Sequence, residues 1–587
     1  MSRASHLALA VLVLLALPLT AAGQTAAPSG TVNAATSIRP IRVVIWDEQQ
    51  PQQREAYDNF LGNHLADQLG RREGLIVDVS GPDLPEQGLS DEVLDNCDVL
   101  VWWGHVRQHE VTPEQADRII QRVKAGKLAL IALHSAHWSQ PFVSAMQARA
   151  EQDALSQLPL AERGSAQVEF VGEFERRPPQ ASDPLTPAYS RVLSDQGWLI
   201  KITRPNCCFP AYRNDGKPST LRTLLPAHPI AADLPREFVL PHTEMYGEPF
   251  HVPEPDAVIL EETWEAGERF RSGMLWRLGR GHVFYFRPGH ETHRVYFEPT
   301  AVKVVENAIR YLGGEVVAGG VAPLSSMPNL ADEQLVAWCI VPFDAKKRGP
   351  EARAEMVERL GLRRVAYDWR DEHVATFEDE ILAYREHGLE FFAFWSWHPA
   401  LEPLLQKYDI HPQIWTINPS PALDTQDERV RAAAEQLLPL VEKTRELGLP
   451  LGLYNHGGWG GEPENLAAVC EYLRREHDAA HVGIVYNFHH GHEHSPRFAE
   501  RLASMVDMLI CLNLDGMLDP TEVNVNDQRF KIVPIGTGRY ERRMIDAIQA
   551  SGYSGPIGIL DHRDDLDAEE SLRANLDGLR GVIAEPR

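Results

Sequence analysis

Histidines and glutamates follow the apolar, strand-like runs in the first half of the sequence. The runs DVLVWW, LALIAL, FVL and GHVFYF are each followed within a few residues by such side chains: His105, His134, His137, His242, Glu244, His290 and Glu291. In an open α/β sheet the carboxyl ends of parallel strands line the ligand crevice. The sequence therefore predicts that imidazoles and carboxylates from distant segments meet in one crevice.

Two kinds of chemistry use such a set of side chains. Imidazole and carboxylate groups together suit acid and base catalysis near neutral pH, and the residues expected to be catalytic are His134, His137, His242 and Glu244. The same groups suit a divalent metal such as Zn, Mn or Mg, and the expected ligands are His105, His134, His242 and His290. The spacing along the chain does not choose between the two, and we expect no nucleotide cofactor.

Residues 41–314 have the pattern of an α/β domain with a parallel sheet. Strand-like runs (IRVVIW, LIVDVS, VLVWW, LALIAL, GHVFYF) alternate with helical stretches such as TPEQADRIIQRVKAG. Residues 145–235 lack a clear period and are expected to be a loop-rich excursion over the sheet. Residues 315–334 are predicted to be a linker.

Residues 335–587 repeat a strand and a helix about eight times. The expected strands are LVAWCIV, RRVAYDW, LEFFAFWSW, IWTINP, LPLGLYNH, HVGIVYNF, MLICLNL and PIGILDH. Eight strand-helix units in about 250 residues predict a (β/α)8 TIM barrel, whose active site would lie at the carboxyl ends of its strands. Nearly every strand there runs into polar residues, and the catalytic candidates among them are His456, His490 and Asp561.

The beginning of the chain and its charge bear on where the protein works. Residues 1–23 combine a short basic start, an apolar run and small residues, which predicts a cleaved signal peptide and a periplasmic or secreted protein. Residues 24–40 would then be a flexible linker. A net charge of −26 argues against nucleic acid as a partner, and we expect no membrane association after cleavage.

The first domain resembles the trehalose-utilisation (ThuA-like) family at VVIWDE, WWGHV, LHSAHWS, HTEMYGEPF and FRPGHE. This resemblance implies a flavodoxin-like fold related to class I glutamine amidotransferases and a role in the catabolism of sugars, particularly disaccharides oxidised at C3. The chain has His134-Ser135-Ala136-His137 where an amidotransferase needs its nucleophilic cysteine, so glutaminase chemistry is excluded. The expected sugar contacts in this domain are Trp103, Arg107, Tyr246 and Glu248.

The second domain resembles the xylose-isomerase-like barrels at its late strands and at SGYSGPIGILDH. That resemblance implies a divalent metal held at the ends of strands five to eight. The matching positions are Asn455, Asn487, Asn513 and Asp561, so three of the four ligands are neutral amides that would hold Mg²⁺ or Mn²⁺ weakly. Neighbouring histidines could rebuild a softer metal site, or the three asparagines could bind sugar hydroxyls without metal.

Three functions remain open at this point. The leading hypothesis is an exported enzyme that acts on 3-keto-glycosides such as oxidised trehalose, by proton abstraction and β-elimination, by hydration, or by both. The second is a sugar isomerase or epimerase. The third is a ThuA-like enzyme attached to a degenerate, carbohydrate-binding barrel.

Overall fold

The structure is a computed structural model that describes residues 39–172, 177–195 and 197–585. The expected signal peptide and most of the linker at 24–40 lie outside these residues. Within them, no helix combines the length and the apolar character that crossing a membrane would require.

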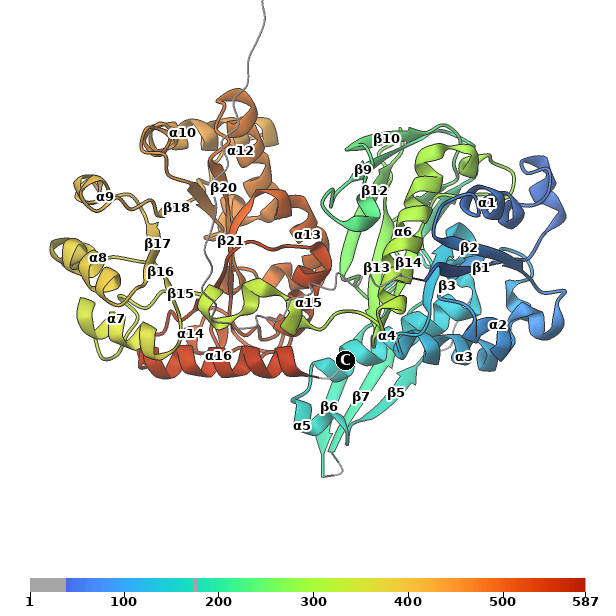
Figure 1. The fold of residues 1–587 in the computed structure, drawn as a ribbon, viewed down its shortest axis with the longest axis horizontal. Coiled ribbons are helices and arrows are strands. Elements are labelled where there is room, and N and C mark those ends of the chain that lie inside the picture. Colours follow the sequence, from blue (N-terminus) through green and yellow to red (C-terminus); the bar gives the residue numbers. More distant parts are fainter. Residues whose placement is uncertain (1–38, 173–176, 196, 586–587) are drawn as a thin grey trace, which may run out of the picture. The chain divides into compact units, whose positions relative to one another are not determined.

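The first domain is built on a mixed sheet with a parallel half and an antiparallel half (Figure 1). The parallel half has the order β2-β1-β3-β4-β14, and its strands are β1 (Ile41–Asp47), β2 (Leu75–Ser80), β3 (Val99–Trp103), β4 (Ala129–Leu133) and β14 (Gly281–Phe286). The antiparallel half continues from β14 through β13 (Arg269–Leu278), β12 (Ala257–Thr263), β9 (Ser219–Thr223) and β10 (Glu237–Leu240). All five strand-like runs named from the sequence form the parallel half, so the predicted α/β fold is confirmed.

Helices bury both faces of the parallel half. One apolar cluster joins the sheet to α1 (Leu61–Leu69) and α6 (Pro299–Val317), and a second joins it to α3 (Pro113–Lys124) and α4 (Gln140–Ser156). Helix α3 starts at a capping box, in which Thr112 and Gln115 satisfy each other's backbone N–H groups. Strands covered on both sides are apolar throughout, which is why these runs are recognisable in the sequence.

The segment at 145–235 is more regular than the sequence predicts. It contains most of α4, a three-stranded sheet and strand β9, which joins the main sheet. The small sheet has the order β5-β7-β6, and its strands are β5 (Gln167–Val171), β6 (Tyr189–Ser194) and β7 (Gly197–Thr203). All residues of β5 and β6 are exposed or half-buried, and the alternation of β5 (QVEFV) is too short to identify a strand.

The second domain is a closed, eight-stranded parallel barrel, as predicted (Figure 1). Its strands are β15 (Val336–Trp338), β16 (Arg364–Tyr367), β17 (Glu390–Trp395), β18 (Gln413–Ile417), β19 (Leu451–Tyr454), β20 (Val482–Asn487), β21 (Leu509–Leu514) and β22 (Ile557–Leu560). The main helices are α7 (Pro350–Arg359), α8 (Phe377–Glu386), α9 (Glu402–Tyr408), α10 (Gln426–Glu446), α12 (Pro463–Glu476), α13 (Phe498–Met505), α15 (Glu541–Ser551) and α16 (Ala568–Ala584). Seven of the eight predicted strand runs contain their strand whole, and β18 begins one residue before its run, at Gln413.

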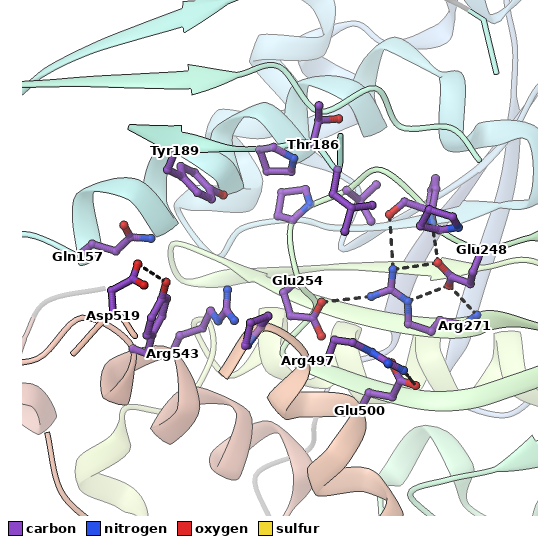
Figure 2. Close-up of a pocket in the computed structure, with 18 of the residues that line it drawn as sticks. Gln157, Thr186, Tyr189, Glu248, Glu254, Arg271, Arg497, Glu500, Asp519 and Arg543 are labelled. Atoms are coloured by element: carbon purple, nitrogen blue, oxygen red, sulfur yellow. Dashed lines mark hydrogen bonds and ion pairs between the residues drawn. The ribbon is translucent and has the colours of Figure 1, made fainter. Parts of the chain in front are cut away.

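Buried ion pairs fasten the first domain internally. Figure 2 shows Arg271 of β13 between two glutamates, with its Nε 2.8 Å from Glu248 Oε1 and its Nη1 3.3 Å from Glu254 Oε2. The carboxylate of Glu248 is therefore used for structure, which argues against its expected role in sugar binding.

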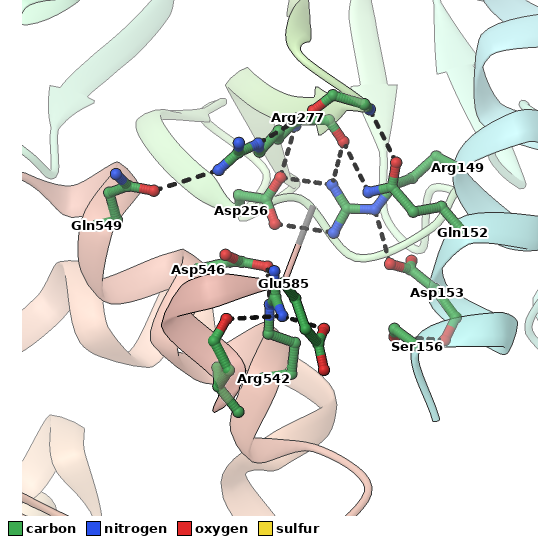
Figure 3. A network of polar contacts seen from close by, with 12 residues as sticks. Arg149, Gln152, Asp153, Ser156, Asp256, Arg277, Arg542, Asp546, Gln549 and Glu585 are labelled. Atoms are coloured by element: carbon green, nitrogen blue, oxygen red, sulfur yellow. Dashed lines mark hydrogen bonds and ion pairs between the residues drawn. The ribbon is translucent and has the colours of Figure 1, made fainter. Parts of the chain in front are cut away.

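A second buried ion pair joins helix α4 to the sheet. In Figure 3, Arg149 on α4 donates to Asp153 (2.7 Å) and to Asp256 (2.8 Å) just before β12. It also donates to the backbone oxygen of Arg277 on β13 (3.0 Å). Burial removes water from these charged groups, and the several hydrogen bonds of each pair offset that loss.

Candidate functional site

The centre of the candidate site is a contact between His134 and Glu244. His134 directly follows strand β4 and has a positive φ of 50°, while Glu244 precedes the short strand β11 (Met245–Gly247). The His134 Nε2 atom lies 3.0 Å from Glu244 Oε2. Gly289 is required beside them, because a Cβ atom at this position would lie 2.7 Å from that of His134.

The hydrogen bonds of His134 define where its protons are. Its Nδ1 atom lies 3.0 Å from the backbone oxygen of Arg287, an acceptor only, so Nδ1 carries a hydrogen. Tyr246 Oη and Glu244 Oε2 both face the other ring nitrogen, at 3.2 Å and 3.0 Å. A close contact between Nε2 and a carboxylate needs one further proton, so the His134–Glu244 pair shares a proton that it can donate.

His290 extends this pair on one side. Its Nδ1 accepts a hydrogen bond from the backbone N–H of Thr292 at 3.0 Å, which leaves Nε2–H facing Glu244 Oε2 at 4.0 Å. Burial, and after it the neighbouring His134, lower the pKa of His290 to about 4. His290 is therefore neutral at physiological pH.

A second dyad, formed by His105 and Glu291, faces solvent. His105 Nδ1 lies 3.1 Å from Glu291 Oε1, and the side chain of His105 is 47% exposed. The hydrogen bond to Glu291 raises the pKa of His105 against the opposing effect of burial. The loop that carries His105 is held by Glu48, whose carboxylate accepts from the backbone N–H groups of Val106 (2.8 Å) and Arg107 (2.6 Å).

The two dyads are connected through His290. The closest contacts run from His105 to Glu291 (3.1 Å), from Glu291 to His290 (3.8 Å), from His290 to Glu244 (4.0 Å) and from Glu244 to His134 (3.0 Å). Imidazoles and carboxylates thus alternate along one chain of contacts at the carboxyl edge of β3, β4 and β14. The contacts of His290 at 3.8 Å and 4.0 Å are longer than hydrogen bonds, so His290 separates two hydrogen-bonded dyads and does not pass a proton between them. The exposed His105 can accept a proton, and the buried His134–Glu244 pair can donate one.

Two histidines expected in the site are occupied elsewhere. His137 is buried against Phe209, and its Nδ1 lies 2.6 Å from the backbone oxygen of Cys207. His242 is exposed and its Nδ1 contacts the backbone oxygen of Gly216 at 3.1 Å. Gly216 in turn lies against the ring of His293, which stacks on that of His290 at 4.4 Å, so His242 lies on the exposed side of the same group of histidines.

The residues expected to contact sugar in this domain lie in different surroundings. Tyr246 stacks on the His134 ring with the centroids 5.0 Å apart, and fully buried Trp103 stacks on it with the centroids 5.7 Å apart. Arg107 forms ion pairs with Asp83 (2.8 Å) and Glu110 (2.8 Å).

The proposed four-histidine metal site is not assembled. The Nδ1 atom of His242 contacts the backbone of Gly216, and His290 turns a protonated nitrogen toward the centre. Within the described ranges, no three His, Cys, Asp or Glu side chains are arranged to hold a metal ion.

Of the barrel positions that match metal ligands in the resembling family, Asn455 is already bonded within the barrel. The amide of Asn455 bridges two strands: its Oδ1 accepts from Asn487 N–H at 2.8 Å, and its Nδ2 donates to Asn487 O at 3.0 Å. Asn513 Oδ1 lies 3.7 Å from Cys511 Sγ in the barrel interior. The side-chain oxygen of Asn455 is therefore already bonded to the backbone of β20 and is not free to bind an ion.

Four histidines of the barrel line a small cavity of about 80 Å³: His456, His489, His490 and His562. The rings of His456 and His490 are 4.6 Å apart, and both line this cavity. Asp561 is fully buried and is not among the lining residues, although we expected it with these two histidines. The sequence did not single out the Lys531 ammonium, which lies 3.5 Å from His490 Nδ1, because no motif marks it.

Comparisons with known proteins agree with this architecture. A family model described as "Trehalose utilisation" matches residues 42–312, and one described as "Xylose isomerase-like TIM barrel" matches residues 368–582. A search of curated proteins finds no match.

Solved structures match each half of the chain. A ThuA-like protein from Bacteroides uniformis is 14% identical over 48% of this chain and 94% of its own, with a TM-score of 0.30. A 3-keto-D-glucoside 4-epimerase from E. coli is 15% identical over 42% of this chain and 99% of its own, with a TM-score of 0.31. A xylose-isomerase-like barrel protein from Mycobacterium smegmatis, in complex with magnesium, is 14% identical over 45% of this chain and 97% of its own, with a TM-score of 0.30.

Proposed function

Because the chain consists of a ThuA-like domain followed by a xylose-isomerase-like barrel, we propose that it is a carbohydrate-active lyase or hydratase that acts on oxidised glycosides. Its substrate would be a 3-keto-glycoside of the trehalose type, and its reaction would take place in the first domain. The observation that supports this proposal is the chain of contacts from His105 to His134, which has an exposed base at one end and a shared proton at the other.

The residues account for each proton of the reaction. A ketone at C3 acidifies the proton on C2, and neutral His105, oriented by Glu291, removes it. The electron pair of the C2–H bond forms the C1–C2 double bond as the C1–O bond breaks. The departing alcohol takes a proton from the His134–Glu244 pair, leaving an unsaturated keto sugar. Hydration is the same sequence reversed with water in place of the alcohol.

The hydrogen-bond donors of the site suit the developing negative charge. The enolate oxygen needs donors that are already oriented, and Tyr246 Oη and the Nε2–H of His290 both turn toward the His134–Glu244 pair. Arg287 keeps this arrangement in place, because its backbone oxygen binds His134 and its guanidinium donates to the backbone oxygen of Glu244 at 2.5 Å.

Product analysis by NMR tests the proposal. We expect the full protein to convert 3-keto-trehalose or 3-keto-glucosides, with and without a chelator, and to leave the unoxidised parent sugars unchanged. Equal turnover of the parents would contradict the role given to the ketone. Turnover that stops with the chelator would contradict acid and base catalysis by side chains alone.

The isomerase hypothesis is the weaker one. Metal-assisted isomerisation needs a firmly bound divalent ion, whereas the Asn455 amide is bonded to the next strand. We further propose that the enzyme is exported. Mass spectrometry of the mature N-terminus tests this: a chain that begins near residue 24 is expected, and one that retains Met1 would contradict export.

A further inference from the structure

The cavity of the barrel continues into a wider groove. The cavity of about 80 Å³ and a groove of about 500 Å³ share two lining residues, Arg370 and Trp395. At about 30 Å³ for each water molecule, the cavity has room for one or two hydroxyl-bearing groups but not for a sugar ring. The groove is large enough for a small ligand, whose edge would reach into the cavity.

Buried polar atoms without partners lie around the cavity. Asp368 Oδ2, His489 Nδ1 and His562 Nδ1 have no hydrogen-bond partner in the described part of the chain. All three residues line the cavity, and Asp368 and His489 are only 1% and 2% exposed. Buried polar groups are almost always hydrogen-bonded, so these atoms indicate a ligand or water molecules that both donate and accept.

Aromatic rings form the wall beside these atoms. Trp395 lines both the cavity and the groove, and its ring lies 4.6 Å from that of Tyr454. Trp369 lines the outer groove, where its Nε1 donates to the backbone oxygen of Ser396 at 3.0 Å. Aromatic faces next to hydroxyl-binding groups match a sugar ring, which has apolar C–H faces and a polar edge.

The cavity is lined by one carboxylate, Asp368, and one guanidinium, Arg370, and a second positive charge lies beside its histidines. The Lys531 ammonium lies 3.5 Å from His490 Nδ1, where a rebuilt metal site would need its ligands. The positive charge of Lys531 is one of the causes that lower the pKa of His456, His490 and His562, after burial. A divalent ion placed among these groups would be repelled by the ammonium at short range.

We infer that the barrel carries a metal-independent binding cleft for a neutral sugar, separate from the acid-base site of the first domain. Asp368, His489 and His562 bind the hydroxyl edge of the sugar, and Trp395 packs against its face. The barrel thus holds a sugar ring while the first domain carries out the chemistry. Binding in this cleft does not require the proposed reaction, so the two can be tested apart.

Isothermal titration calorimetry on the full protein tests this cleft. The probes are D-glucose, trehalose and D-glucuronate, each titrated in EDTA and again in MgCl₂. We expect a neutral sugar to bind in EDTA, and magnesium to change its affinity by less than about twofold. Asp368→Asn and Trp395→Ala should each weaken binding by about tenfold or more, because a buried acceptor or a stacking surface is lost.

The controls separate this cleft from other sites. Trp459→Ala removes a half-buried tryptophan that contacts Gln426 outside the cleft, and it should bind sugar like the wild type. If Asp368→Asn fails to fold, Trp395→Ala still tests the cleft, since Trp395 lies at its rim. The inference is overturned if no neutral sugar binds, if only glucuronate binds, if magnesium is required, or if both variants bind as tightly as the wild type.

Discussion

Replacing Glu262 by glutamine should destabilise the first domain and its candidate site together. Glu262 on β12 and Arg287 after β14 are both 0% exposed and form a bidentate ion pair, with Arg287 Nε 2.6 Å from Glu262 Oε2. The same Arg287 holds the backbone of Glu244 and, through its own backbone oxygen, the ring of His134. Glutamine fits the same space but leaves the guanidinium without its counter-charge.

The expected cost follows from burial. Removing one partner of a fully buried ion pair costs about 3–5 kcal/mol, because the other charge stays desolvated and unpaired. Glutamine can still accept one hydrogen bond from Arg287, so we expect about 3 kcal/mol. For a domain of this size, each kcal/mol lowers the melting temperature by roughly 2–4 °C, which gives a decrease of about 6–12 °C.

Differential scanning calorimetry measures this effect, and a neighbouring residue provides the matched control. Glu261 on the same strand forms ion pairs with Arg222, which is 60% exposed, and with Arg269, which is 33% exposed. Glu261→Gln should therefore cost less than about 1 kcal/mol. A Glu262→Gln variant that melts within about 2 °C of the wild type, or no lower than Glu261→Gln, would refute this reasoning.

The remaining predictions concern the two candidate sites. Glu291→Gln removes the carboxylate that raises the pKa of His105, so the acidic limb of the pH profile of kcat/KM should move to lower pH; an unmoved limb would mean that His105 is not the base. His134→Gln should reduce kcat by about a hundredfold, whereas His242→Gln should stay within about threefold, and similar losses in the two would disprove the placement of the site. Burial raises the pKa of Asp368 to about 7, above the value of about 3.9 expected in the unfolded chain, so its contribution to stability is full below about pH 4 and is lost as the pH rises through 7. Thermal unfolding should accordingly show Asp368→Asn gaining stability relative to the wild type between pH 5 and pH 8, and a relative loss over this range would contradict the shift.

The fold was accessible from the sequence because its parallel strands are buried on both sides. Most of these strands are continuous apolar runs, whereas the edge strand β2 alternates between buried and exposed residues. The exposed strands β5 and β6 have no such pattern and were expected to be loops. Sequence patterns report burial, so they identify best the elements that are buried most.

The candidate site was only partly accessible for a related reason. Strand ends bring His105, His134 and His290 to one edge because β3, β4 and β14 lie close together in the parallel half of the sheet. His242 follows β10, at the far edge of the sheet, and lies beside this group only through Gly216 and His293, which the order of strands does not reveal. The ion pair between Glu248 and Arg271 joins side chains 23 positions apart, and no local motif predicts it.

Exchange of the C2 proton tests the central claim most directly. A methyl 3-keto-glucoside is incubated in D₂O with the protein and a chelator. The loss of the C2–H signal is followed by proton NMR and compared with a sample without protein. We predict rapid exchange with the wild type and a rate at least about a hundredfold lower with His105→Gln. Equal exchange by the variant and the wild type, or exchange that appears only when metal is added, would contradict proton abstraction by the His105–Glu291 dyad.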